Sequence, residues 1–150
     1  MHVIYLHGFA SSPESSTALF LGERLADSGL TLECPDLYQP DFSTLTVSRM
    51  ITQVEMLIDS LTPGTVALIG SSLGAFVAWH VAAQADRRGR GVSAADAPAH
   101  RITHLVLLAP ALDFGTNRMP HLGPDGLARW RATGQLEVDH HAEGQKRIVH

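Results

Sequence analysis

The sequence of 150 residues has the length of one domain, and its 45% hydrophobic content is enough to form one core. Charged residues make up 17% of it and the formal net charge is −4, a balance that argues against a nucleic-acid partner. A single cysteine excludes an internal disulfide, and the lack of a basic leader or of an apolar run of about 18 residues predicts a soluble, cytoplasmic protein without membrane contact.

The first part of the chain alternates short apolar runs with amphipathic segments. Residues 2–8 (HVIYLHG) predict a buried strand that ends at a glycine. The next segment predicts a helix with Ser12 as its N-cap and Gly29 just after its end. A second strand is expected at residues 30–34, and apolar residues at a spacing of 3.6 predict a second helix within residues 43–60.

The same alternation continues further along the chain. Residues 64–70 predict a third strand, residues 73–88 a third helix and residues 102–112 a fourth strand, while the Gly/Ala/Pro-rich residues 89–100 are a candidate mobile loop. Apolar strands without alternation, separated by helices, are typical of a parallel sheet covered on both faces. The sequence therefore predicts the α/β class, with a mostly parallel sheet and helices on both faces, in a single domain of residues 1–150.

Residues 113–150 have the weakest pattern. One short helix is expected within residues 124–134, and no clear period follows it. A sheet that ends at the fourth strand would leave an edge or a face uncovered, so a homodimer through this region is one expectation. The residues expected to line an apolar substrate site are Phe114, Leu122 and Trp130.

The sequence Gly70-Ser71-Ser72-Leu73-Gly74 follows the third predicted strand and opens the third predicted helix. This position suits the Gly-x-Ser-x-Gly pattern, in which a serine nucleophile stands on a strained strand-to-helix turn and the glycines avoid clashes. Ser72 is the central residue of the pattern. A structural alternative is that the glycines only allow a tight turn and the serines cap the helix. A phosphate-binding P-loop is excluded, because no lysine follows Gly70 in the turn.

A second feature is the His-Gly-Phe sequence that ends the first predicted strand. An oxyanion developing on a substrate needs a second backbone donor from a loop beside the nucleophile. The backbone N–H groups of Phe9 and Leu73 are the expected pair. His7 is expected to be a structural histidine that shapes this loop through a hydrogen bond.

The segments YLHGFASSP, CPDL and IGSSLGAF, in this order, resemble the α/β-hydrolase superfamily and, within it, the small YqiA-like esterases. The similarity extends from residue 1 to about residue 112. It implies hydrolysis of a carboxylic ester or thioester through an acyl-enzyme on Ser72, with a small-molecule acyl substrate and without a cofactor or a metal. One alternative is a non-catalytic binding or interaction module that retains the fold but lacks a complete triad. Another is acyl transfer to an acceptor other than water, which would share the first half of the reaction.

Serine needs a histidine base, which an acid orients, in the chain order Ser, acid, His. The family places that acid after the strand that follows residues 102–112, and the histidine after one more strand. Here the chain ends about one helix beyond the fourth predicted strand. We therefore expect a C-terminally shortened domain in which the usual acid and histidine have no counterpart.

Other residues could take these two roles in the required chain order. Asp113, directly after the fourth predicted strand, is a candidate acid, although an aspartate here could also cap a turn. The candidate bases are His140, His141 and His150, for which a solvated tail is the alternative interpretation. The same region contains the sequence DHHAE, but adjacent histidines rarely converge on one ion, and no metal site is expected.

Two further side chains are assigned structural roles. The spacing of Phe76, Trp79 and Ala83 predicts a packed face of the third helix, so Trp79 is expected in the core and not at a substrate. Cys34, before Pro35, is expected to be a small buried hydrophobic residue.

Overall fold

The computed structural model describes residues 1–90 and 99–150, without the side chains of residues 114–121. The elements up to the last strand of the main sheet are β1 (His2–Leu6), α1 (Ser16–Ala26), β2 (Leu32–Glu33), the 3₁₀ turn η1 (Phe42–Thr44), α2 (Val47–Ser60), β3 (Gly64–Ser71), α3 (Leu73–Gly89) and β4 (His100–Leu108). They are followed by α4 (Phe114–Thr133) and the strands β5 (Leu136–His140) and β6 (Gln145–Val149). Of the predicted mobile loop at residues 89–100, residues 91–98 lie outside the described part of the chain.

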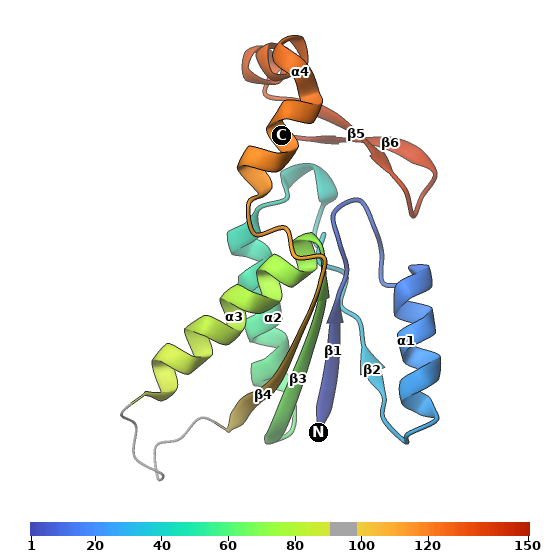
Figure 1. The fold of residues 1–150 in the computed structure, drawn as a ribbon, viewed down its shortest axis with the longest axis vertical. Coiled ribbons are helices and arrows are strands. Elements are labelled where there is room, and N and C mark those ends of the chain that lie inside the picture. The colour runs from blue at the N-terminus through green and yellow to red at the C-terminus, as the bar shows by residue number, and fades with distance from the viewer. Residues whose placement is uncertain (91–98) are drawn as a thin grey trace.

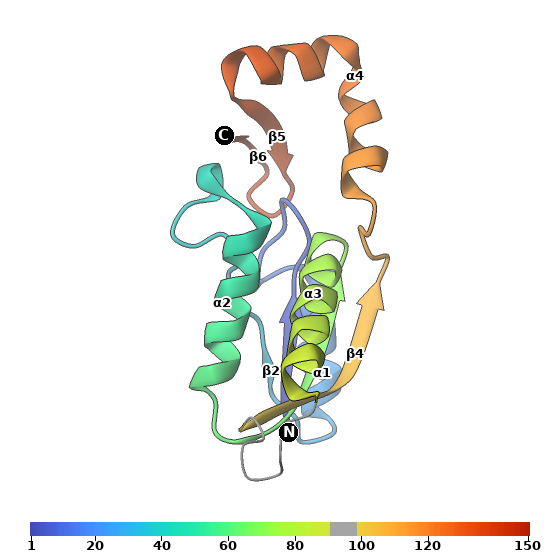
Figure 2. The ribbon, with the colours of Figure 1, turned by 90° about the vertical axis from the view of Figure 1, so that its left-hand side faces the viewer.

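The four-stranded sheet has the order β2-β1-β3-β4, and all its neighbouring strands are parallel. Helix α1 lies on one face of this sheet, whereas α2 and α3 lie on the other, as Figure 1 and Figure 2 show. The α/β class with helices on both faces is confirmed. The connections that follow β1 and β3 leave neighbouring strands for opposite faces, and in open α/β sheets ligands bind at such a switch point.

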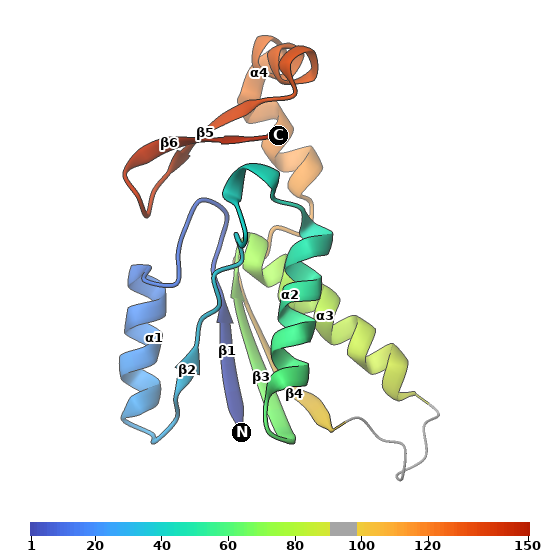
Figure 3. The ribbon, with the colours of Figure 1, turned by 180° about the vertical axis from the view of Figure 1, so that it is seen from behind.

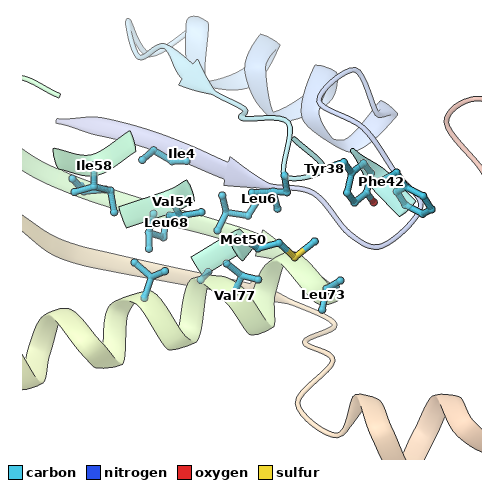
Figure 4. Close-up of a cluster of buried hydrophobic side chains, with 14 of the residues drawn as sticks. Ile4, Leu6, Tyr38, Phe42, Met50, Val54, Ile58, Leu68, Leu73 and Val77 are labelled. Atoms are coloured by element: carbon cyan, nitrogen blue, oxygen red, sulfur yellow. The ribbon is translucent and has the colours of Figure 1, made fainter. Parts of the chain in front are cut away.

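The main hydrophobic core lies between the sheet and the helices α2 and α3. Two strands at its centre contribute buried apolar side chains, and α2 adds the 3.6-spaced residues that its sequence predicts. Figure 4 shows these side chains converging from both sides. The strand residues are Ile4, Leu6, Val66 and Leu68, and the helix residues are Met50, Val54, Ile58, Val77 and Val81.

Strand β4 is less covered than its sequence predicts. Its apolar side chains Leu105, Val106 and Leu108 are exposed, with Val106 reaching 45%. In the part of the chain that the structure describes, β4 pairs only with β3, so its other edge carries unpaired backbone groups. The homodimer through this region stays a prediction.

Beyond β4 the chain forms a kinked helix and a hairpin. Helix α4 bends at Gly123, whose φ of 66° is not helical, and extends well beyond the short helix predicted at residues 124–134. Strands β5 and β6 pair antiparallel, and sequence analysis missed both. In Figure 3 this hairpin lies beyond the carboxyl end of the main sheet, near η1, and the His150 N–H donates a hydrogen bond to the Ser43 carbonyl at 2.8 Å. None of the described helices is long and apolar enough to span a bilayer.

Three local predictions are wrong. Helix α1 begins at Ser16 and is capped by the Ser15 hydroxyl, not by Ser12. The second strand spans only Leu32–Glu33. Trp79 is 43% exposed, because the buried face of α3 is formed by other residues. That face consists of Leu73, Gly74, Ala75, Val77, Ala78 and Val81.

Candidate active site

Ser72 stands between the last residue of β3 and the first residue of α3, as its motif predicts. Its backbone has φ 51° and ψ −114°. Positive φ is uncommon for a residue with a Cβ, and such strain persists only where the surrounding structure imposes it. The expected strand-turn-helix geometry at Ser72 is confirmed, while its catalytic role stays a prediction.

The two flanking glycines are required by close backbone contacts. A Cβ on Gly70 would lie 2.5 Å from the Ala75 Cα, and a Cβ on Gly74 would lie 2.0 Å from the Leu6 carbonyl oxygen. No side chain fits at either position without moving backbone atoms. The glycines therefore let the chain double back after β3 and let α3 pack directly against the end of β1.

The hydroxyl of Ser72 is not used to cap the helix that follows it. Ser72 occupies the N-cap position of α3, yet its side chain makes no capping hydrogen bond. Its backbone carries the local connections instead: the Ser72 N–H donates to the Leu108 carbonyl at 2.9 Å, and the Ser72 carbonyl accepts from the Ala111 N–H at 3.1 Å. The structural alternative, in which Ser72 serves as a capping serine, loses its main support.

His7 has the structural role that the sequence predicts. Its side chain is buried, Nδ1 lies 3.0 Å from the Gly8 carbonyl oxygen, and Nε2 accepts a hydrogen bond from the Leu37 N–H at 3.3 Å. This arrangement requires the proton on Nδ1, which then donates to Gly8. Burial lowers the pKa of His7, against a smaller opposing effect of the Gly8 hydrogen bond. A neutral His7 fastens the loop after β1 to the segment after β2.

The His-Gly loop and the elbow lie side by side at the carboxyl end of the sheet. Strands β1 and β3 are neighbours, with Leu6 opposite Gly70, so their following residues emerge together. A Cβ on Gly8 would lie 3.3 Å from the Ser72 Cβ. The peptide that carries the Phe9 N–H therefore adjoins Ser72, and the Leu73 N–H is the first of α3. The oxyanion role of Phe9 and Leu73 stays a prediction.

The candidate acid and bases are dispersed. Asp113 is exposed and precedes α4, and its side chain makes no capping bond. His141 and His150 are exposed, whereas His140, at the end of β5, is 2% exposed. Across the side chains that the structure describes, none of these four groups forms a hydrogen bond with Ser72.

His140 belongs to a cluster of rings that sequence analysis did not find. Its ring centroid lies 5.0 Å from that of Phe42 and 5.7 Å from that of Tyr38. Both His140 ring nitrogens lack a hydrogen-bond partner in the described structure, and Glu143 Oε1 stands 3.8 Å from Nε2, beyond hydrogen-bonding distance. His140 therefore docks the hairpin through ring packing, mainly on Phe42.

Tyr38 is the other member of this cluster that touches the site. Its hydroxyl donates to the Gly8 carbonyl at 2.8 Å and accepts from the Ser11 N–H at 3.1 Å. The signal in the sequence is Asp36-Leu37-Tyr38 after the second strand, where the Asp36 carboxylate accepts a hydrogen bond from the Tyr38 N–H at 2.9 Å and forms a local turn.

The described side chains contain no group of three or more His, Cys, Asp or Glu residues arranged to bind a metal ion. In the DHHAE segment, Asp139 and His140 end β5, and the next three residues begin the hairpin turn, where Glu143 pairs with Arg147 of β6 at 2.8 Å. Cys34 is only partly buried, and desolvation raises the pKa of its thiol to about 11, so it is not an activated nucleophile.

Comparison with known proteins gives a family and a fold. Residues 2–148 match the family described as "Uncharacterised protein family (UPF0227)", and the chain belongs to that family. It is similar to a crystal structure described as "Putative hydrolase from Agrobacterium vitis S4", with 24% identity and a TM-score of 0.78. The alignment covers 98% of this chain and 56% of that chain, so this chain spans little more than half the length of that neighbour. No match was found among curated proteins.

Proposed function

We propose that this member of the UPF0227 family is a serine hydrolase of the α/β-hydrolase superfamily that forms an acyl-enzyme on Ser72. The observation that carries the proposal is the strained backbone of Ser72 at the N-terminus of α3, with a hydroxyl that caps nothing. Mere helix capping does not require a serine at φ 51°. A nucleophile elbow does, since it lifts the hydroxyl above the sheet.

The proposed reaction is acyl transfer to water in two steps. The Ser72 Oγ attacks the acyl carbonyl carbon of an ester or thioester, its proton passes to a general base, and the alcohol or thiol leaves with a proton. Water then attacks the acyl-enzyme, and the free acid is released with the hydroxyl of Ser72 restored. The N–H groups of Phe9 and Leu73 stabilise the negative oxygen in both steps, helped by the N-terminus of α3.

The substrate class is a small acyl ester or thioester with an apolar acyl group. Leu122 and Trp130 of α4 are half-buried in the structure. Phe114, the third expected lining residue, lies among the side chains outside the described part. Their contact with substrate stays a prediction.

One observation favours the alternative of a non-catalytic interaction module. Among the described side chains, no histidine forms a hydrogen bond with Ser72, and His140 is enclosed by Tyr38 and Phe42. Without a base, serine is a weak nucleophile. The two proposals therefore differ in the reactivity of Ser72. A serine hydrolase reacts at Ser72, at least when a base is supplied, whereas an interaction module does not.

Modification by a fluorophosphonate distinguishes them. The chain of residues 1–150 is incubated with the probe, with and without imidazole as an external base, and each adduct is located by peptide mass spectrometry. We expect the adduct on Ser72, with a rate that imidazole increases, because the elbow and the oxyanion donors remain in place when the base is missing.

Ser71→Ala is the matched control, since it removes the neighbouring hydroxyl of the same motif. This variant should be labelled at the rate of the parent chain, and Ser72→Ala should not be labelled at that position. Rapid labelling without imidazole would mean that the chain holds its own base. If Ser72 stays unmodified even with imidazole, the hydrolase proposal is wrong and the interaction module is favoured.

A further inference from the structure

Two described backbone carbonyls of the candidate site accept three hydrogen bonds each, that of Ser72 and that of Gly8, and only the Gly8 carbonyl accepts them from side chains as well as backbone. It receives the Tyr38 hydroxyl at 2.8 Å, His7 Nδ1 at 3.0 Å and the Ser11 N–H at 3.3 Å. A carbonyl oxygen has two lone pairs, so three donors within 3.3 Å restrain its direction strongly. Loops are ordinarily more mobile than the elements that they connect, so this restraint fixes a peptide that would otherwise be free to turn.

The orientation of this carbonyl determines the orientation of the Phe9 N–H. Both groups belong to one planar peptide, and in a trans peptide the C=O and N–H bonds point in opposite directions. Donors that hold the Gly8 oxygen on one side therefore aim the Phe9 N–H at the other side. The same peptide adjoins the elbow, because a Cβ on Gly8 would lie 3.4 Å from the Ser71 carbonyl oxygen as well as near Ser72.

Tyr38 connects the two ends of the loop with a single hydroxyl. It donates to Gly8 and accepts from the N–H of Ser11, across the bend where Ala10 has φ 56°. His7 and Ser11, the other two donors, are themselves part of the strand end and of the loop. Tyr38 therefore provides the one donor of the three that comes from outside the loop, and this donor can fix the orientation of the Gly8–Phe9 peptide.

The Tyr38 side chain is itself held rigidly. Its ring makes edge contacts with His7 at 4.8 Å and with Phe42 at 4.7 Å between centroids, and it is buried. Figure 4 shows Tyr38 and Phe42 adjoining each other beyond the end of β1. Burial raises the pKa of Tyr38 to about 12, so its hydroxyl keeps its proton at every pH at which the protein would work.

We infer that Tyr38 is a positioning residue for the oxyanion site: its hydroxyl holds the Gly8–Phe9 peptide so that the Phe9 N–H points to the place where negative charge develops beside Ser72. This inference rests on the proposed hydrolase function and adds a residue to it. Tyr38 touches no reacting atom, and it acts through the Gly8 carbonyl. Pre-orientation of such a donor is what makes it effective, because the donor then needs no rearrangement during reaction.

Tyr38→Phe tests the role, since it removes the hydroxyl and retains the ring packing. Tyr5→Phe is the matched control: it removes the only other tyrosine hydroxyl, from a buried position in β1, and in the described structure that hydroxyl makes no hydrogen bond to residues 8–11. The rate of inactivation of Ser72 is measured at several fluorophosphonate concentrations, with saturating imidazole. These data give two separate quantities: the maximal rate of inactivation and the fluorophosphonate concentration at half that rate.

We expect Tyr38→Phe to lower the maximal rate about tenfold and to leave the half-saturating concentration unchanged, because a misaligned donor weakens only the transition state, less than the 10²–10³-fold loss of a whole donor. Tyr5→Phe should match the parent chain. A purely structural role of Tyr38 would lower the melting temperature of Tyr38→Phe without this split. The second readout is the backbone amide NMR signal of Phe9, which should shift and broaden in Tyr38→Phe alone.

The outcomes separate the two proposals. If the parent chain is labelled at Ser72 and Tyr38→Phe is labelled equally fast, the positioning role is wrong and the hydrolase proposal stands. If the parent is not labelled even with imidazole, the hydrolase proposal falls, and with it the catalytic meaning of Tyr38. An unchanged Phe9 signal in Tyr38→Phe contradicts the orienting contact whatever the labelling shows.

Discussion

The elbow at residues 70–74 and the hairpin of β5 and β6 are both close to the candidate site, but they are held in different ways. At the elbow, backbone atoms pack so closely that Gly70 and Gly74 admit no side chain. The hairpin is attached by the ring of His140, the side chain of Val149 and a backbone hydrogen bond from His150 to Ser43. The turn at Ser72 is therefore determined by close local backbone packing, whereas the hairpin is held by a few contacts with a distant segment of the chain.

The largest expected effect comes from a methyl group at the elbow. Gly74→Ala would place a Cβ 2.0 Å from the Leu6 carbonyl oxygen, a distance that requires β1 and α3 to move apart. We expect a loss of at least about 3 kcal/mol in the free energy of unfolding, at the upper end of what overpacking costs. Urea unfolding followed by circular dichroism measures it.

Gly22→Ala is the matched control, because a Cβ at this α1 position meets nothing within 4 Å. Alanine is a better helix former than glycine, so this variant should gain about 0.5–1 kcal/mol. A similar small change in both variants would show that the elbow is looser than its backbone contacts indicate.

The sequence predicted the elbow well because the motif depends on residues that are neighbours in the chain. Gly70, Ser72 and Gly74 lie within five positions, and the apolar run before them and the helical spacing after them define the turn. The core face of α2 was predicted for the same reason: Met50, Val54 and Ile58 follow a local period. A local sequence pattern predicts structure well where the residues of one segment determine the geometry of that segment.

Predictions failed in two situations. In one, two nearby residues could fill the same structural role; in the other, burial depends on elements distant in the sequence. Ser12 and Ser15 both accept a backbone N–H, the first from Glu14 in a turn and the second from Ala18 at the start of α1, and the sequence does not distinguish them. Of the predicted packed face of α3, Phe76 and Ala83 are half-buried and Trp79 is exposed. The fully buried residues of α3 lie on another part of its surface, which the local sequence pattern of the helix does not distinguish.

The hairpin of β5 and β6 has a weak signal in the sequence, an alternation of inward-facing and charged residues. Within β5, Leu136, Val138 and His140 alternate with charged residues, and only this alternating set faces inward. Gly144 follows with φ 63°, as a tight connection requires. A histidine at the most buried position of β5 obscures the alternation, because histidine is not an apolar residue.

A second, smaller effect is expected at His140. Its two buried nitrogens have no partner in the described structure, and an unsatisfied buried polar group costs about 1–3 kcal/mol. His140→Phe keeps a ring against Tyr38 and Phe42, so we expect it to stabilise the protein by about 1 kcal/mol. His140→Ala leaves a cavity there and should destabilise the protein by about 2 kcal/mol.

Thermal or urea unfolding measures both variants, with His141→Phe as the control at the neighbouring exposed position. An exposed substitution should change stability by less than about 0.5 kcal/mol. A destabilised His140→Phe would mean that the nitrogens of His140 interact with groups that matter, and that the hairpin is held by more than ring packing.

The smallest expected effect concerns turnover, and it decides whether the two regions cooperate in catalysis. The elbow carries the proposed nucleophile, Ser72. The four titratable candidates of the C-terminal region form no hydrogen bond with Ser72 among the described side chains; they are Asp113, His140, His141 and His150. A triad that lacks one member retains only the catalysis of the oxyanion site and of binding, about 10³–10⁴-fold over water, and its turnover is far below that of a complete site.

We therefore expect the chain of residues 1–150 to hydrolyse a short activated ester hardly faster than its Ser72→Ala variant, within about tenfold, since a serine without its base contributes little. The initial rate with a nitrophenyl ester at pH 6–9 measures the difference. Strong turnover that depends on Ser72 would contradict this expectation, because a histidine would then have to reach the elbow. Alanine substitutions at Asp113, His140, His141 and His150, made one at a time, would identify it: loss of the rate at His140 would require the hairpin to leave Tyr38 and Phe42, whereas loss at His141 or His150 would leave that cluster in place.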